Sequence, residues 1–175
     1  LAAGGGDGAI RLFDAAGGDE VRRCEGHQDA VRSLAFSPNG TTLVSGGGDS
    51  AVRQWDVSTG KEIHPFAGPQ GQVAALAVSP DGKTVASAGW DRRVHLWDAA
   101  SGAERRSLEV SDCERIAVLG FSPDGRSLTA VGRGGGNAVL VWDATDGKRR
   151  GAFSLSEKDY PNAFALSPDA ALVAA

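Results

Sequence analysis

The stretch AGWDRRVHLWD, residues 88–98, contains the dipeptide Trp-Asp twice, and only one of the two copies can belong to a repeating pattern. An aromatic residue followed by aspartate recurs along the chain at intervals of 42, 42 and 45 residues, at Phe13-Asp14, Trp55-Asp56, Trp97-Asp98 and Trp142-Asp143. Trp97 is therefore the repeating tryptophan. Trp90 is an additional one that needs its own explanation.

Two further markers keep the same register. A turn sequence recurs as FSPNG, VSPDG, FSPDG and LSPDA, at residues 36–40, 78–82, 121–125 and 166–170. An apolar or near-apolar residue follows each repeating aromatic residue by eleven positions, at Cys24, Phe66, Leu108 and Phe153. Self-similarity at a period of about 40 residues indicates a repeat architecture, in which each period is one supersecondary unit.

Each unit is predicted to form four short strands. Proline fixes φ inside the Ser-Pro-Asn-Gly turn, and glycine accepts the left-handed conformation at its end. In the second unit we expect strands near Val31–Ser37, Leu43–Ser45, Val52–Asp56 and Glu62–Phe66. Helical periodicity of useful length is absent from the sequence, which predicts an all-β chain.

These correlated markers resemble the WD-repeat β-propeller family over essentially the whole chain. The resemblance implies a propeller of four-stranded antiparallel blades, with about four repeat units present. The units are expected at residues 1–24 (partial), 25–66, 67–108, 109–153 and 154–175 (partial). Both ends fall inside a second strand, and three arrangements stay open: a piece of a seven- or eight-bladed ring, self-association of two copies into an eight-bladed ring, and closure as a four-bladed ring.

The family's buried hydrogen-bonded tetrad of His, Ser or Thr, Asp and Trp is implied for the second unit, at His27, Ser45, Asp49 and Trp55. A buried tryptophan needs a partner for its indole N–H, and a linked network makes the blade rigid. The same histidine, serine and aspartate could be read as a hydrolase triad, but no oxyanion-hole element accompanies them.

The other units keep only part of this tetrad. The third has Ser87, Asp91 and Trp97, with Pro69 in place of histidine. The fourth keeps Trp142 but has Ala130 for serine, and the first has Phe13 for tryptophan. We expect these units to depend on packing more than on the tetrad.

Trp90 lies in the turn immediately before Asp91, where other units have Gly6 and Gly48. The resemblance places this turn on the upper face of the propeller, which more often carries ligands. One interpretation is a partner-contacting aromatic residue beside Arg92 and Arg93, because tryptophan and arginine dominate binding hot spots. The other is that Trp90 folds down and only packs. The same face is expected to carry Asp29, Gln70, Gln72, Glu114, Arg115 and Arg133, a mixed-charge surface that fits a protein partner better than a polyanion.

Net charge is −4 and the isoelectric point is near 5.3, which argues against sequence-independent nucleic-acid binding. No apolar run approaches the roughly 18–20 residues that span a bilayer, so we expect no membrane association. Cys24 and Cys113 lack metal-ligand spacing, and a reducing, cytoplasmic setting follows as the expectation, without cofactor or metal. Cys24 is expected to pack within its strand, and Cys113 to be exposed in a loop.

Two other features receive structural interpretations. His64 and His95 have no ligand-spaced partners, and His95 aligns with Arg53 as an ordinary strand residue. The arginine pairs at 22–23, 105–106 and 149–150 fall in or beside the fourth strand, the outer edge of each blade. Charges at such an edge protect against edge-to-edge pairing.

The leading functional hypothesis is a non-catalytic protein–protein interaction scaffold that presents loops on one propeller face. The alternative is a sensor or recruitment module attached to a catalytic domain outside this stretch. A propeller enzyme is a third possibility, which the absence of a recurring carboxylate pair or histidine cluster disfavours. The chain is therefore not expected to be an enzyme.

Overall fold

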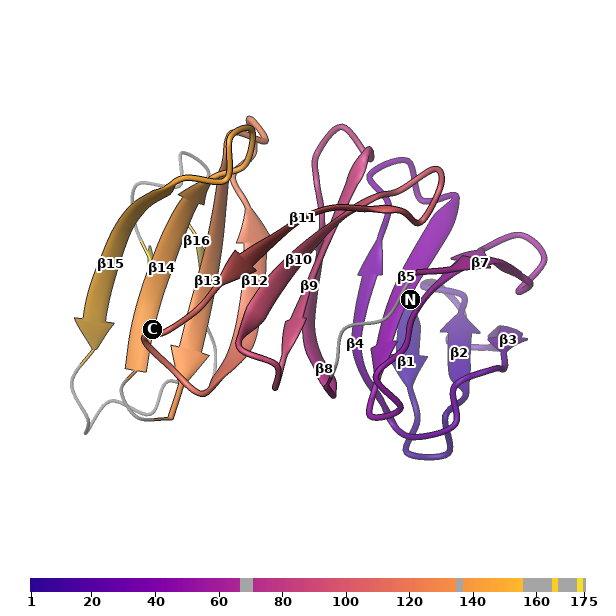
Figure 1. Ribbon diagram of the computed structural model, residues 1–175. Coiled ribbons are helices and arrows are strands. Elements are labelled where there is room, and N and C mark those ends of the chain that lie inside the picture. Colours follow the sequence, from indigo (N-terminus) through magenta and orange to yellow (C-terminus); the bar gives the residue numbers. More distant parts are fainter. Residues whose placement is uncertain (67–70, 135–136, 156–164, 167–172, 175) are drawn as a thin grey trace.

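The chain folds into consecutive antiparallel β-sheets, and the computed structural model describes residues 1–66, 71–134, 137–155, 165–166 and 173–174 (Figure 1). No helix occurs among these residues. The expected all-β class with four-stranded antiparallel sheets is confirmed.

Each sheet is formed by strands that are consecutive in the chain. The first sheet has three strands, β1 (Ala2–Gly4), β2 (Ile10–Phe13) and β3 (Glu20–Cys24). The second has four, β4 (Val31–Phe36), β5 (Thr42–Gly47), β6 (Val52–Asp56) and β7 (Glu62–Pro65). The third has β8 (Val73–Val78), β9 (Thr84–Gly89), β10 (Arg93–Asp98) and β11 (Glu104–Glu109). The fourth has β12 (Arg115–Phe121), β13 (Ser127–Arg133), β14 (Asn137–Asp143) and β15 (Arg149–Leu155), and a further pair consists of β16 (Ala165–Leu166) and β17 (Val173–Ala174).

Strand bounds in the second sheet differ slightly from those expected. β5 runs from Thr42 to Gly47 and not only from Leu43 to Ser45. The extension follows from pairing on both sides, because Gly46 pairs with Val52 of β6 and Gly47 pairs with Val31 of β4. A ladder that is satisfied on both edges continues through glycines despite their low strand propensity.

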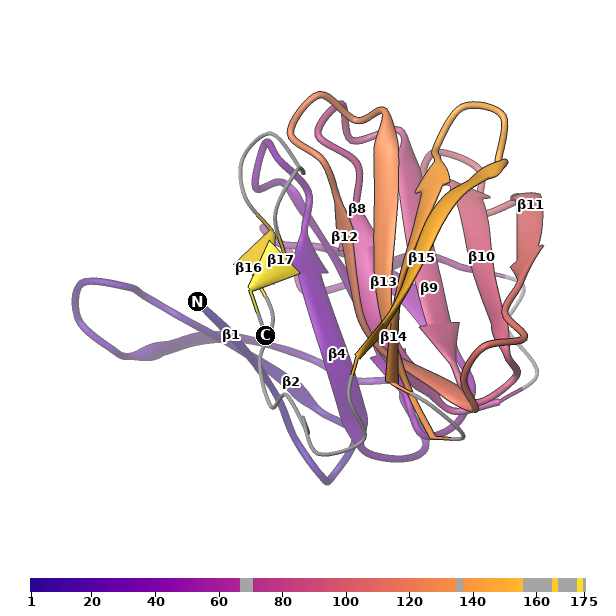
Figure 2. The ribbon, with the colours of Figure 1, turned by 90° about the vertical axis from the view of Figure 1, so that its left-hand side faces the viewer.

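The sheets stack side by side in chain order through their first strands. β1 contacts β4, β4 contacts β8, and β8 contacts β12. Figure 2 shows β8 and β12 side by side in the view turned by 90°. The last strands β3, β7, β11 and β15 are edge strands of their sheets. A four-stranded sheet cannot cover its own faces, so this stacking provides its core.

The core between successive sheets repeats with the sequence. Trp55 of β6 is buried with Ile10 and Leu12 of the first sheet. Trp97 of β10 is buried in the same way with Val44 and Val52 of the second sheet. Trp142 of β14 packs with residues of the third sheet. The repeating tryptophans thus occupy matching places, each at the boundary with the preceding sheet.

Two kinds of tight turn join the strands at the end that we name the lower end, which holds turns 37–41, 79–83 and 122–126 and turns 57–61, 99–103 and 144–148. In the first kind, the Ser79 hydroxyl donates to Asp81 and accepts from the Thr84 amide. In the second kind, the aspartate of each Trp-Asp pair caps the turn, as where Asp56 Oδ1 accepts from the Thr59 amide at 2.7 Å. The aspartate recurs because this turn needs an acceptor at its start. The opposite, upper end holds turns 5–9, 48–51 and 90–92 and the segments that lead into β4, β8 and β12.

Candidate functional site

The second sheet contains a continuous buried hydrogen-bond chain. The Trp55 indole N–H donates to Ser45 Oγ at 2.7 Å, and Ser45 Oγ lies 2.7 Å from His27 Nε2. His27 Nδ1 lies 2.9 Å from Asp49 Oδ1. Ser45 and the His27 ring are fully buried. The four residues assigned from the sequence are therefore together in one network.

The direction of the protons in this network follows from the partners. A carboxylate only accepts, so His27 Nδ1 carries the proton that it donates to Asp49. Ser45 already accepts from the indole, and its hydroxyl donates to His27 Nε2 when the ring is neutral, which leaves no buried hydrogen unpaired. Burial opposes the charge of Asp49, but the Gln28 amide, the His27 ring and the Ala51 amide together lower the pKa of this carboxyl group.

Of that hydrogen-bond network, the third sheet keeps only the bond between tryptophan and serine. Trp97 donates to Ser87 Oγ at 2.8 Å. Asp91 is instead bound by His95 of β10, whose Nε2 lies 2.7 Å from Asp91 Oδ2. The other ring nitrogen lies 2.8 Å from Glu104 Oε1. His95 lies in strand β10, as expected, but it has a further role that the sequence did not indicate, because its ring joins two carboxylates that come from different parts of the unit.

A positional pattern in the sequence could have revealed this cluster. His95 occupies the position of Arg11 and Arg53, two residues before the repeating aromatic residue, and a glutamate follows that aromatic residue by seven positions in each of these units. Arg53 pairs with Glu62 at 2.9 Å, and Arg11 lies 3.9 Å from Glu20. A cation facing a glutamate on the next strand thus recurs three times, and in the third unit this cation is a histidine.

The fourth sheet has neither arrangement at these positions. Trp142 is buried, but Ala130 stands where the serine would be, and Leu140 occupies the position of His95. Both apolar residues are completely buried in the core shared with the third sheet. Packing therefore replaces the polar contacts at these two positions.

Trp90 stands out at the upper end, in the turn between β9 and β10. Its side chain is 55% exposed, whereas Trp55, Trp97 and Trp142 are buried. The Arg115 guanidinium, from the start of β12, lies 5.2 Å from the centre of the Trp90 ring. This cation–π contact bridges the third and fourth sheets and holds an exposed aromatic face at their junction.

Trp90 has space in its turn because the third unit has a glycine where the second unit has a larger residue nearby. In the second unit Gly48 lies beside Asp29, and a Cβ on Gly48 would be 2.6 Å from Asp29 Oδ2. The corresponding positions of the third unit hold Trp90 and Gly71, and a Cβ on Gly71 would be 3.5 Å from the Cβ of Trp90. In the second unit the larger residue of the two lies in the connecting segment, and in the third unit it lies in the turn.

The other predicted contact residues are spread around Trp90 and differ in their environments. Arg92 is exposed and has a left-handed backbone with φ of 58°. Arg93 is engaged along the sheet, with Ser107 at 3.0 Å and Glu109 at 2.9 Å. Arg133 pairs with Arg115 in the register of β12 and β13, and the Gln72 carbonyl accepts from the Trp90 amide. Gln70 lies outside the described residues.

Comparison with known families decides what these sheets are. The family described as WD domain, G-beta repeat matches residues 18–56 and 60–98, and these two ranges end at Trp55-Asp56 and Trp97-Asp98. The chain therefore contains two WD repeats. A search of curated proteins gave no match. WD repeats generally mediate protein–protein interaction and are typically non-catalytic.

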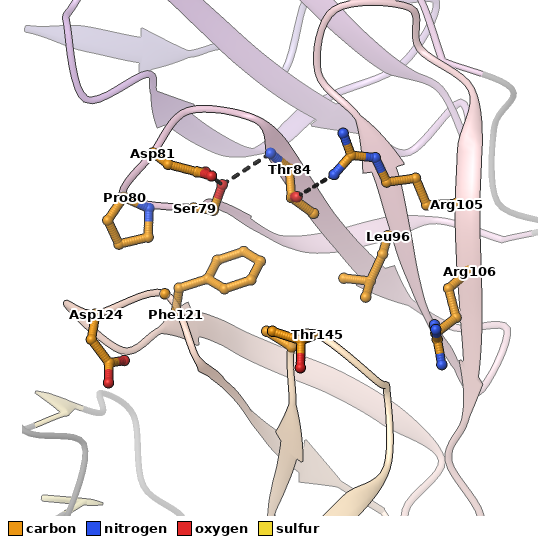
Figure 3. A pocket seen from close by; sticks show the side chains of 12 residues that line it. Ser79, Pro80, Asp81, Thr84, Leu96, Arg105, Arg106, Phe121, Asp124 and Thr145 are labelled. Atoms are coloured by element: carbon orange, nitrogen blue, oxygen red, sulfur yellow. Dashed lines mark hydrogen bonds between the residues drawn. The ribbon is translucent and has the colours of Figure 1, made fainter.

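The lower end of this WD-repeat protein has a groove at the junction of the third and fourth sheets, with a volume of about 640 Å³ (Figure 3). Leu96 and Phe121 face it, and Arg105 and Asp81 lie at its rim. Its polar groups are already bonded to neighbours, since Arg105 donates to Thr84 at 2.9 Å and Asp81 accepts from Ser79 at 2.6 Å. A groove of about 650 Å³ lies between the second and third sheets and is lined by the equivalent turns. Both grooves therefore follow from the stacking of the repeats.

The thiol of Cys113 is buried in the WD-repeat protein, with the residue only 4% exposed, so the expectation of an exposed Cys113 was wrong. It packs against Gly132, where a Cβ would lie within 1.9 Å of the sulfur. Burial and the charge of Asp112 raise the pKa of this thiol to about 11. The loop therefore contributes a core residue. Cys24 is also buried.

The arginine pairs lie on the edge strands β3, β11 and β15. Several are bound to carboxylates, as where Arg149 donates to Asp112 at 2.8 Å and Arg150 donates to Asp143 at 2.7 Å. These arginines therefore have ionic partners within the protein. Across the described ranges, no group of three or more His, Cys, Asp or Glu side chains is arranged to hold a metal ion, and no helix there is long and apolar enough to cross a membrane.

Proposed function

We propose that this WD-repeat protein is a non-catalytic scaffold that binds a protein partner at the upper junction of its third and fourth sheets. The exposed indole of Trp90, with the Arg115 guanidinium over its ring, carries the proposal. An aromatic residue that is half exposed costs free energy in water, and an indole beside arginine is the composition of a binding hot spot.

Charge around this junction supports a protein partner. Exposed Glu114 directly precedes Arg115 in the chain, and Arg92 is exposed in the turn that carries Trp90, so this surface has residues of both signs. Interfaces between proteins combine an aromatic centre with a polar rim, and tryptophan and arginine are enriched in them. We also propose a cytoplasmic location, with which the two free cysteines are compatible.

The test is site-specific photo-cross-linking. A photoreactive amino acid replaces the exposed Glu114 at the upper end, and a matched variant replaces the exposed Arg126 at the lower end. We expect a discrete cross-linked protein from position 114 and not from position 126, and we expect its loss when Trp90→Ala is added. Equal products from both positions, undiminished by Trp90→Ala in a folded protein, would contradict the proposal.

A further inference from the structure

The cluster of Asp91, His95 and Glu104 in the third sheet is explained neither by the tetrad nor by the scaffold function. The ring of His95 is 10% exposed and the carboxylate of Asp91 is 8% exposed. The ring also stacks on Trp97, with 5.4 Å between the ring centres. These contacts fix the imidazole in one orientation between two acceptors.

The geometry requires a charged ring. A neutral imidazole has one N–H and one acceptor nitrogen, whereas carboxylates can only accept. Both ring nitrogens lie within 2.8 Å of a carboxylate oxygen, so both must donate. Burial alone would lower the pKa of His95, but the hydrogen bonds and charges of Asp91 and Glu104 outweigh it and raise this pKa. The pKa of Asp91 is lowered, because its bond to His95 and the charge of His95 outweigh the effect of burial.

On the two strands paired with β10, no ionisable side chain lies directly opposite His95. The neighbouring strands present Ser87 of β9 and Ser107 of β11 opposite His95, and both are uncharged. Arg93, on the same strand, is bound to Ser107 and Glu109. His95 is the side-chain partner of Asp91, whose other carboxylate oxygen accepts from the Arg93 amide at 3.1 Å.

Loss of the proton would act on the turn that displays Trp90. A neutral His95 can donate to only one carboxylate, and its second nitrogen then faces an acceptor without a hydrogen between them. If Asp91 loses the bond, a largely buried carboxylate remains with backbone contacts alone, which is costly. Asp91 directly follows Trp90, so the position of the indole depends on this bond.

We propose that Asp91, His95 and Glu104 form a pH-sensitive clamp, in which the charged ring of His95 fixes the turn carrying Trp90 and its deprotonation releases that turn. The equivalent positions of the first and second units hold Arg11 and Arg53. Arginine keeps its positive charge over the pH range in which histidine titrates. The third unit thus replaces a permanent cation with a switchable one, next to the exposed tryptophan.

The significance of the clamp for binding rests on the proposed function, but its test requires no partner. The 175-residue chain is labelled with 5-fluorotryptophan, and the signal absent from Trp90→Phe is assigned to Trp90. The His95 ring is followed by NMR in parallel, and the signal absent from His95→Arg identifies it among the three histidines. We expect the His95 ring to titrate above the ordinary value of about 6.5. The Trp90 signal should shift with the same midpoint, and the His95→Arg variant should lose this shift.

Two results would overturn the clamp. One is titration of His95 at or below the ordinary value. The other is a Trp90 signal that changes with pH in the same way in the wild type and in His95→Arg. In the wild type, the Trp97 signal serves as the control, because Trp97 stacks on the His95 ring and should report its change of charge. If His95→Arg is not native by signal dispersion, Glu104→Gln provides the same test, because removal of one carboxylate should lower both midpoints together. Failure here leaves the cross-linking result unaffected, so the two proposals can fail separately.

Discussion

Gly71 lies directly against Trp90, and a Cβ atom on Gly71 would be 3.5 Å from the Cβ of Trp90 and 3.2 Å from the Asp91 amide nitrogen. The second unit has the opposite combination, Asp29 beside Gly48. We predict that Gly71→Asp crowds the turn and destabilises the protein by about 1–2 kcal/mol.

The double variant Gly71→Asp/Trp90→Gly restores the residue sizes of the second unit. It should lose less free energy of unfolding than the two single variants together, with a coupling of about 1 kcal/mol. Urea unfolding of the four proteins measures this cycle. Additive effects of the two substitutions would show that the residue at position 71 does not limit the side chain at position 90.

Among the described residues, the Ser45 hydroxyl is hydrogen-bonded to two buried groups, whereas the Ser87 hydroxyl is hydrogen-bonded to one. Ser45→Ala leaves both the Trp55 indole and His27 Nε2 unpaired, and Ser87→Ala leaves only the Trp97 indole unpaired. We expect a loss of about 2–4 kcal/mol for Ser45→Ala and about 1–2 kcal/mol for Ser87→Ala. Chemical denaturation gives both values, and equal losses would count against the linked network.

Arg92 occupies a strained backbone position, with φ of 58°, which Gly8 fills in the first unit with φ of 78°. Arg92→Gly should therefore stabilise the protein by about 1 kcal/mol, because glycine has no Cβ to clash in the left-handed region. Ser50→Gly, at the equivalent position with φ of 63°, is the matched control for stability. Thermal unfolding tests the gain. We expect only Arg92→Gly to weaken cross-linking at position 114.

Stability should depend on pH in a direction set by His95 and Asp91. The folded pKa of His95 is raised, so its contribution is complete below the ordinary value of about 6.5 and disappears as pH rises through the folded value. The folded pKa of Asp91 is lowered, so its contribution is present above its ordinary value and disappears as pH falls through the folded one. The urea midpoint should therefore fall toward acid pH, where Asp91 is protonated, and toward alkaline pH, where His95 loses its proton. His95→Arg should remove only the fall toward alkaline pH. A wild-type midpoint that stays level there would contradict the assignment.

Gly132 is constrained by Cys113. A Cβ on Gly132 would overlap the thiol, whereas a Cβ on Gly6 would meet nothing within 4 Å. We predict a loss of about 1–3 kcal/mol for Gly132→Ala and little change for the control Gly6→Ala. Differential scanning calorimetry compares them, and a neutral Gly132→Ala would show that the Cys113 loop adapts freely.

Much of the fold follows from the repeat in the sequence. The interval between aromatic-aspartate pairs and the Ser-Pro-Asn-Gly turn predicted the strands of the second unit, because turn chemistry and strand length limit the alternatives. The extension of β5 to Gly47 could not be predicted from glycine's low strand propensity, since pairing on both edges overrides it.

The site was less accessible from sequence, for two physical reasons. The exposure of Trp90 depends on where Arg115 and Gly71 lie in space, and they belong to two different units. His95 was missed because its partners precede and follow it by four and nine positions and only meet when β10 and β11 pair. Cys113 was expected to be exposed because its segment connects two sheets, yet it fills the space that Gly132 leaves.

Hydrogen–deuterium exchange with the cross-linked partner tests the central claim, binding at the upper junction of the third and fourth sheets, most directly. The account predicts that the partner slows exchange in residues 88–93 and 113–116, and that the lower turns 79–83 and 122–126 are unchanged. Protection confined to the lower turns or to the edge strand β11, with residues 88–93 exchanging as in the free protein, would contradict it.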